Sequence, residues 1–370
     1  MDSIRVATGL GRGPRAQPEI AATAVARALD RAGISGARSV ILFLSHHFAD
    51  DPKPALRAAA RTAGCTQIAG CTAAGLLTEE EWMLDVPAAA AMVVGGDGFL
   101  DSVVRKNDED AVMSLTAPGN LAADWLDANY RRIGLVAGDA VGRGPFRVWS
   151  GGQIRREGYA EVAVRGVQSS LAASQGVRAL TSPIEVAEVH DYDVLKLGHY
   201  PALNVLVQAL PIGVREMDRI PLHLIMGGVT FGDPATAIKD GRYRLNHIVA
   251  ANMSDQSITF AQRLSRGERL FWAMRDTLAA ERDMRATIDR AALALKAPPH
   301  FALLFPCIGR GPHFYGNTDR DLDLLKHRFP GLPILGAYGN GEIGPLDEAN
   351  HLYQYSAVLG LFRGTGTRGR

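Results

Sequence analysis

The sequence predicts an α/β protein of the mixed α+β kind, built as two domains whose mixed β-sheets are covered by helices. Three observations lead to this fold class. The chain has 370 residues, 47% of them hydrophobic, which exceeds the usual size of a single hydrophobic core. Short apolar runs of strand length alternate with segments of helical periodicity, and glycines separate them. A strand, helix, strand order also occurs twice.

The first strand, helix, strand unit lies near the N-terminus. Ser39–Ser45 (SVILFLS) is a nearly continuous apolar run, which predicts a buried strand. Lys53–Gly64 places small apolar residues on one helical face and ends at a glycine, which predicts a helix. Thr66–Cys71 then returns as a second strand, so the three segments form one supersecondary unit.

The second unit repeats this order near the C-terminus. Phe301–Cys307 is predicted as a strand, Asp319–Phe329 as a helix and Leu332–Tyr338 as a strand. Each unit ends in a loop bracketed by glycines, at residues 70–75 and 336–341. This correspondence predicts an internal strand-helix-strand duplication.

The sequence between the two units is rich in strand patterns. The expected strands are Ile133–Ala137, Tyr159–Arg165, Ile184–His190 and His247–Asn252. Gly151-Gly152 predicts a tight turn between two strands, and Glu268–Leu295 has the spacing of a long core-covering helix or helix pair. Lys196–Pro201 interrupts the strand pattern, so we expect the domains to span residues 1–198 and 199–370.

The charge balance limits the classes of partner. The formal net charge of +1 comes from 40 basic and 39 acidic residues spread along the chain, which argues against nucleic acid and membrane partners. Met1–Leu10 lacks the pattern of a secretory signal, and Val86–Gly96 is much shorter than the ~20 apolar residues of a membrane span. We therefore expect a cytoplasmic protein.

The three cysteines, Cys65, Cys71 and Cys307, form no CxxC pair, so neither a disulfide framework nor a thiolate metal site is expected. Small buried side chains are the default interpretation of cysteines beside loops. An enzyme with Cys307 or Cys71 as nucleophile remains an alternative, with His313 available in sequence as a base. Because no GxxxxGK[ST], HExxH or GxSxG motif occurs, no catalytic residues are expected and a non-enzyme is the preferred interpretation.

Two glycine-rich loops are the main candidates for a ligand site. The tetrapeptide Gly-Arg-Gly-Pro follows an apolar run at residues 11–14, 142–145 and 309–312, and α/β sheets commonly bind ligands where strands end. Arg310 in the third copy offers a forked donor for a carboxylate, and Glu342 in the loop 339–345 offers an acceptor for an ammonium group. The pair suits an amino acid or similar zwitterion. Plain turn chemistry and a solvated glutamate are the alternative interpretation.

Several segments resemble a known family. Ile41–Ser45 together with Ile68–Gly75 resembles the N-terminal FIST domain, and Val136–Gly166 fits the later half of that domain. Leu304–Arg310, with its Cys-x-x-Arg-Gly element, and Gly336–Pro345, with Gly-Glu-Ile-Gly-Pro, resemble the C-terminal FIST domain. The resemblance covers nearly the whole chain.

The resemblance implies an intracellular small-ligand sensor, with amino acids as the favoured ligand class and a separate signalling partner such as a histidine kinase. No cofactor is expected. A haem-binding nitric-oxide sensor, with one histidine as the axial ligand, is the alternative. Gly75-Leu76-Leu77 stands where the family commonly has Gly-Glu-Ile, which shifts the expected site towards the C-terminal loops. The expected ligand-binding residues are Cys307, Arg310, Gly311, Asn340, Gly341, Glu342, Cys71 and Thr72.

Overall fold

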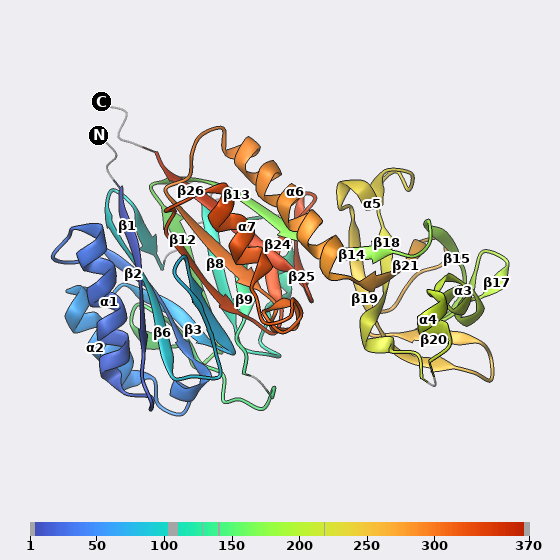
Figure 1. Ribbon diagram of the computed structural model, residues 1–370, viewed down its shortest axis with the longest axis horizontal. Coiled ribbons are helices and arrows are strands. Elements are labelled where there is room, and N and C mark those ends of the chain that lie inside the picture. The colour runs from blue at the N-terminus through green and yellow to red at the C-terminus, as the bar shows by residue number, and fades with distance from the viewer. Residues whose placement is uncertain (1–3, 103–109, 128, 140, 218, 366–370) are drawn as a thin grey trace. The chain divides into compact units, whose positions relative to one another are not determined.

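The computed structural model describes residues 4–102, 110–127, 129–139, 141–217 and 219–365, which form two compact units. Unit 1 combines the chain up to Ser174 with the chain from Asp283 onward, and unit 2 is the segment Gln175–Arg282. The elements of each unit are labelled in Figure 1. The expected boundary between residues 198 and 199 falls within unit 2, where β16 (Asp193–Leu197) ends and β17 (Tyr200–Pro201) begins. It stays a prediction about the sequence domains.

The first sheet of unit 1 contains the N-terminal strand, helix, strand unit. Its strand order is β1 (Ile4–Arg12), β6 (Ala88–Gly96), β2 (Ser39–Ser45), β3 (Ile68–Ala73), β10 (Val148–Ser150) and β11 (Gln153–Ile154). β2 and β3 are parallel, whereas the other pairs are antiparallel. Helices α1 (Pro18–Ala32) and α2 (Lys53–Ala63) cover one face, and the 3-10 helix η1 (His46–Phe48) follows β2.

A second sheet repeats this arrangement with different strands. Its order is β13 (Val167–Ser174), β26 (Ala357–Gly364), β22 (Phe301–Pro306), β23 (Ile334–Tyr338), β4 (Gly75–Thr78) and β5 (Trp82–Leu84). Again the only parallel pair among these described strands is the third with the fourth, β22 with β23. Helices α6 (Thr277–Leu295) and α7 (Arg320–Arg328) cover it, and η4 (Ile308–Arg310) follows β22. The shared order supports the predicted duplication.

Hairpins join the two repeats, because the hairpin that follows each repeat in the chain pairs with strands outside that repeat. Hairpin β4–β5 belongs to the first repeat in sequence but pairs with β23 of the second, with Gly75 opposite Tyr338. The corresponding hairpin of the second repeat lies in a third sheet, with the order β25 (Ala349–Tyr353), β24 (Glu342–Leu346), β9 (Arg131–Val136), β8 (Ala111–Thr116), β12 (Tyr159–Arg165) and β7 (Phe99–Asp101). The 3-10 helix η2 (Ala123–Leu126) lies between β8 and β9 in the chain.

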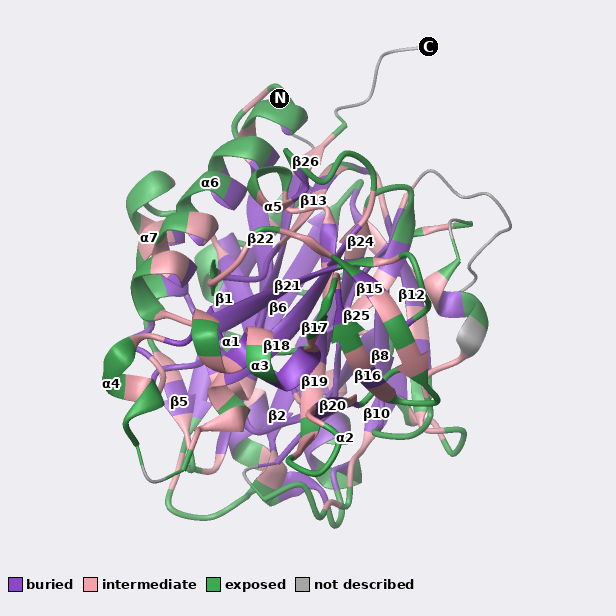
Figure 2. Ribbon diagram, turned by 90° about the vertical axis from the view of Figure 1, so that its right-hand side faces the viewer, coloured by how far each residue is buried: buried purple, intermediate pink, exposed green. Residues whose placement is uncertain are grey.

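Both faces of the central strands are buried, which explains their continuous apolar sequences. In β2, Ile41 and Phe43 face a core shared by all three sheets, while Val40 and Leu42 face α1 and α2. Strand β22 alternates in the same way, and Phe305 meets Phe43 edge to face, with the ring centroids 5.7 Å apart. Figure 2 shows the strands largely buried and the outward sides of the helices exposed.

Unit 2 is a closed antiparallel barrel. Its strands are β14 (Val177–Ala179), β15 (Ile184–His190), β16, β17, β18 (Ile225–Thr230), β19 (Tyr243–Asn252), β20 (Ser257–Phe260) and β21 (Arg269–Arg275). The ring β21-β15-β16-β20-β19-β18 closes because β18 also pairs with β21. The helices are α3 (Ala202–Ala209), α4 (Ile212–Arg215), α5 (Ala237–Asp240) and η3 (Leu222–Leu224). Leu203, Leu206, Phe260 and Trp272 lie in its core.

The mixed α+β class is confirmed, as is the turn at Gly151-Gly152, where positive φ angles of 59° and 70° connect β10 to β11. The long helix expected over Glu268–Leu295 is wrong in its first part, because residues 269–275 form strand β21. Leu270 to Ala273 are all buried in the barrel wall, and a fully buried strand has no polar face to distinguish it from a helix by periodicity.

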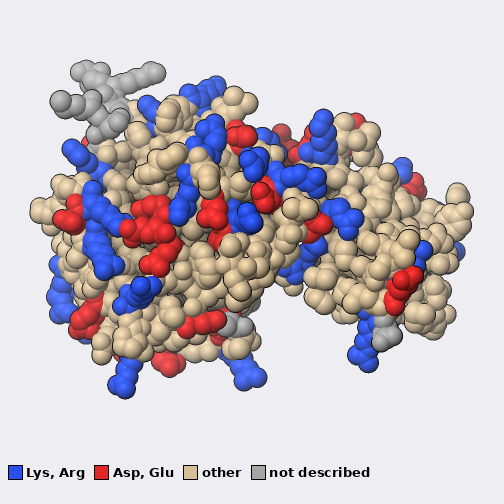
Figure 3. Space-filling view, in the orientation of Figure 1, with Lys and Arg blue, Asp and Glu red and all other residues tan. Residues whose placement is uncertain are grey.

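Charged side chains of both signs are interspersed on the face shown in Figure 3, in line with the balanced composition. Within the described residues, none of the helices combines the length and the apolarity needed to cross a membrane.

Candidate functional site

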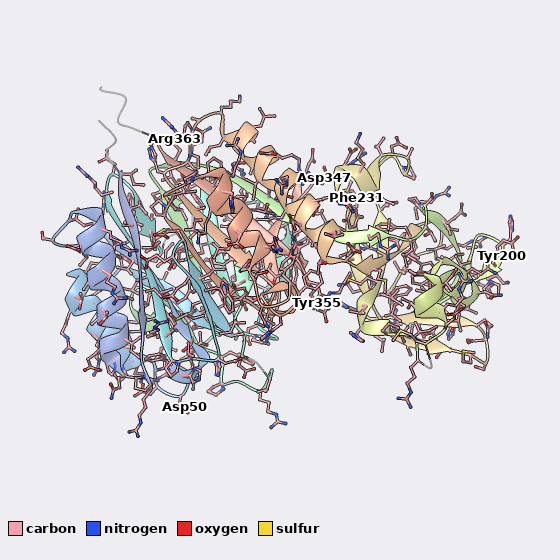
Figure 4. The ribbon with its side chains drawn as sticks, in the orientation of Figure 1. Asp50, Tyr200, Phe231, Asp347, Tyr355 and Arg363 are labelled. Carbon is pink, nitrogen blue, oxygen red and sulfur yellow. The ribbon has the colours of Figure 1, made fainter. Side chains whose placement is uncertain are left out.

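The structure brings Cys307 and Glu342 together at the end of β22. Cys307 forms a parallel bridge with Gly339, and its backbone N–H donates to the carbonyl oxygen of Ser356 at 2.9 Å. The Ser356 hydroxyl in turn donates to Oε2 of Glu342 at 2.8 Å. Tyr355, the neighbour of Ser356, is labelled in Figure 4. We refer to Cys307, Glu342 and Ser356 as the Glu342 cluster.

Glu342 is a buried carboxyl group that is only half satisfied. The residue is 0% exposed, and its Oε1 atom has no hydrogen-bond partner. Burial raises the pKa of Glu342 well above its usual range, although hydrogen bonds from the Ser356 hydroxyl and the Cys307 thiol oppose that shift. A buried oxygen without a partner is unfavourable by about 1–3 kcal/mol. The site therefore has an acceptor that a positively charged group could satisfy.

The cysteine thiols are not in activating surroundings. Burial raises the pKa of Cys307, and the nearby Glu342 carboxylate raises it further. Cys71 lies in β3 opposite Val148 and is fully buried, which raises the pKa of its thiol as well. Nucleophilic cysteines require the opposite shift, so this geometry does not favour a cysteine enzyme.

Arg310 lies in a buried ion pair. Its side chain is 1% exposed and donates to both carboxylate oxygens of Asp321, at 2.9 and 3.0 Å. It also donates to the carbonyl and hydroxyl oxygens of Ser174, both at 2.8 Å. Asp321 accepts a further bond from the Tyr315 hydroxyl at 3.0 Å. A ligand carboxylate could reach the guanidinium group only by displacing Asp321 or Ser174.

A second buried carboxyl group, Asp319, lies beside this ion pair. Its Oδ1 accepts the backbone N–H of Leu322 at 2.9 Å and so caps α7, while Oδ2 accepts the Tyr338 hydroxyl. Burial raises the pKa of Asp319 to about 7, and the charge of Asp321 contributes to the shift. Asp319 was expected at the start of this helix, with no further role. The sequence indicates its position as a helix cap, whereas its burial and its bond to Tyr338 depend on the tertiary structure.

Gly341 and Asn340 connect the Glu342 cluster to the third sheet. Asn340 donates its backbone N–H to Val136 at 3.0 Å, and Val136 donates to the carbonyl oxygen of Gly341 at 2.8 Å. Gly138 lies so close to this loop that a Cβ atom there would be 2.8 Å from the Asn340 side chain. Cys307, Asn340, Gly341 and Glu342 thus form one structural neighbourhood.

The other expected residues have different surroundings. Gly311 ends η4, and a Cβ atom there would be 3.1 Å from the Tyr338 ring. Thr72 lies in β3, where its hydroxyl oxygen accepts the backbone N–H of Arg147 at 3.0 Å. By chain order the counterpart of Cys307 is Ser45, which precedes η1 as Cys307 precedes η4, so Cys71 and Cys307 are not at equivalent positions.

The three Gly-Arg-Gly-Pro copies all contact groups of the protein itself. Gly11 and Arg12 of the first copy lie inside β1, where Arg12 pairs with Glu81 at 3.4 Å. The second copy wraps Asp139, whose carboxylate accepts the backbone N–H groups of residues 141–144. The third copy contains Arg310, which Asp321 binds. Among the described residues, no group of three or more His, Cys, Asp or Glu side chains is placed to hold a metal ion.

Comparisons with known proteins identify the family. The FIST N domain model matches residues 38–200, and the FIST C domain model matches residues 200–345. An uncharacterized protein of Mycobacterium tuberculosis is 26% identical over 97% of this chain and 100% of its own length. An uncharacterized protein of Mycobacterium bovis is 24% identical over 97% of this chain and 99% of its own. The human F-box only protein 22 is 39% identical over 16% of each chain.

The chain therefore belongs to the FIST family. FIST domains are in general sensory domains of signal transduction rather than catalytic domains.

Proposed function

We propose that this FIST protein senses an amino acid or a similar small zwitterion and signals through a separate partner protein, such as a histidine kinase. The observation that supports the ligand class is the Oε1 atom of Glu342, a buried acceptor without a partner in the loop that carries the most specific family element. An ammonium group at Oε1 would supply the missing hydrogen bond and favour the ionised carboxylate.

Because the site is completely buried, ligand binding would require a change in the conformation of the protein. A ligand reaches Glu342 only when the loop at residues 339–341, which contains two glycines, moves away from Val136 and Cys307. Ligand binding is therefore coupled to an opened arrangement of the loop. Such a difference in affinity between two states is the requirement for a ligand to shift a conformational equilibrium.

Arg310 has a revised role in this proposal. Because Asp321 and Ser174 already take its guanidinium donors, we propose that Arg310 fixes η4 and so holds the Cys307 side of the site. Binding of the ligand carboxylate by Arg310 would require Asp321 to leave.

Isothermal titration against the twenty amino acids tests the proposal. A ligand that binds Glu342 as an ammonium group releases a proton from the carboxyl group, so its measured enthalpy varies with the ionisation enthalpy of the buffer. The variant Glu342→Gln keeps the shape and an acceptor for Ser356 but loses the charge. We expect its dissociation constant to rise at least tenfold, whereas the matched control Glu348→Gln, in an exposed turn, leaves it unchanged.

Unchanged affinity in Glu342→Gln, or no amino acid bound by the wild type, would contradict the proposal. The haem alternative is tested on the same sample by adding haem and recording the absorption spectrum. A shifted Soret band that one histidine variant abolishes would replace the amino-acid proposal with a haem site.

A further inference from the structure

A second feature of unit 1 lies away from the Glu342 cluster. The start of α2 and the β10–β11 hairpin enclose a cavity of about 620 Å³, a volume suited to a small molecule. Four of its lining residues are basic, namely Lys53, Arg57, Arg147 and Arg156, whereas two are acidic, Asp50 and Asp51. The lining thus carries two more positive than negative charges. Asp50 is labelled in Figure 4.

The four basic side chains of this cavity lack ionic partners. Among the described residues, none of the four forms an ion pair with the protein, whereas Arg132, Arg165 and Arg310 of unit 1 each pair with a carboxylate. Their charge is therefore available to a ligand rather than neutralised within the protein.

Arg147 is the most firmly positioned of the four. Its backbone N–H donates to the Thr72 hydroxyl at 3.0 Å, and its carbonyl oxygen accepts the backbone N–H of Thr72 at 2.9 Å. Its Nε atom donates to the carbonyl oxygen of Ala49 at 2.9 Å, while the two terminal nitrogens have no partner in the described chain. Arginine in this state presents its two terminal NH2 groups in a fixed plane, which suits a phosphate or carboxylate.

The lining also contains apolar surface. Leu56, which is buried, and Ile154, which is half-buried, contribute to the cavity alongside the basic side chains. The space is larger than a bare inorganic ion needs. An organic anion fits both properties, because its carbon skeleton can contact Leu56 and Ile154 while its charged groups meet the arginines.

We propose that this cavity binds a small organic anion with at least two negative charges, carried by phosphoryl or carboxylate groups, and that Arg147 is its central ligand-binding residue. Arg57, Arg156 and Lys53 surround that anchor as exposed cations. The site uses none of the residues of the Glu342 cluster, so it is a second ligand site of the protein.

Isothermal titration with two probes, inorganic pyrophosphate and citrate, tests this second site. We expect at least one probe to bind the wild type, with an affinity that falls as NaCl rises from about 50 to about 300 mM because salt screens exposed charges. Binding of pyrophosphate alone would assign the site to phosphoryl ligands, and binding of citrate alone to carboxylate ligands. Failure of both probes to bind would overturn the proposal.

The variant Arg147→Gln should weaken binding of the probe at least tenfold, and Arg57→Gln and Arg156→Gln severalfold each. The matched control is Arg61→Gln, which removes the same charge from an exposed position of α2 that does not line the cavity. An equal loss in Arg61→Gln and Arg147→Gln would show nonspecific charge attraction and contradict the site. Glu342→Gln should bind the probe normally, which separates this test from that of the amino-acid proposal.

Discussion

The two repeats of unit 1 differ at the same topological position, the junction between a buried strand and the helix that follows it. In each, a buried strand leads through a 3-10 turn to a helix, from β2 to α2 in the first repeat and from β22 to α7 in the second. At the second junction Arg310 is buried against Asp321. At the first junction Arg57 and Arg147 line a cavity without an ionic partner. An arginine near such a junction is thus available to a ligand only where no carboxylate of the protein pairs with it.

The connections between strand and helix also differ in length. Residues 46–52 connect β2 to α2, whereas residues 307–319 connect β22 to α7. The longer segment supplies Tyr315, whose hydroxyl donates to Asp321, and Asp319, which accepts the Tyr338 hydroxyl. The shorter segment supplies Asp50 and Asp51, which line the cavity but, within the described residues, form no ion pair with its four basic side chains.

The largest expected effect comes from breaking the Arg310–Asp321 ion pair at the second junction, which we call the closed junction. Asp321→Ala leaves the charge of Arg310 buried without its carboxylate, so we expect the free energy of unfolding of unit 1 to fall by about 3–5 kcal/mol. Urea denaturation followed by circular dichroism measures this change. The double variant Arg310→Met, Asp321→Leu removes both charges and should recover most of the loss. A single variant as stable as the wild type would contradict the described ion pair.

A smaller effect is the pH dependence of stability that Asp319 gives to the second junction. The native pKa of Asp319, about 7, lies above its ordinary value of 3.8, so the folded protein binds this proton more tightly than the unfolded chain. Its contribution to stability is complete below about pH 4 and is lost as the pH rises through about 7. Asp319→Asn keeps an α7 cap and should flatten this decline, which amounts to a few kcal/mol at most.

Urea denaturation at several pH values between about 4 and 8 compares the Asp319→Asn variant with the wild type. Parallel stability curves for the two proteins over that range would show that Asp319 titrates normally.

The smallest expected effect concerns the first junction. Arg57 is exposed and has no ion pair, so Arg57→Gln should change the free energy of unfolding by no more than about 0.5 kcal/mol while it weakens anion binding. Thermal denaturation beside the binding titration measures both. A large loss of stability in this variant would mean that Arg57 supports the fold, and the contrast between the junctions would then be weaker.

Local sequence patterns predicted the two strand, helix, strand repeats but not how these repeats are joined. The runs at 39–45 and 301–307 correspond to β2 and β22, and the helix expected at 319–329 is α7. The exchange of hairpin β4–β5 and the closed barrel of unit 2 depend on pairings between distant segments, which periodicity does not encode. The neighbourhood of Cys307 and Glu342 was expected from their glycine loops. The burial of Arg310 was not, because it depends on Ser174, far away in sequence.

A single ³¹P NMR titration of pyrophosphate tests the contrast between the junctions most directly. The account predicts that wild type and Asp321→Asn broaden the pyrophosphate signal alike, whereas Arg147→Gln does not broaden it. Broadening that persists in Arg147→Gln and disappears in a folded Asp321→Asn protein would place the anion at the Arg310 junction and contradict the account.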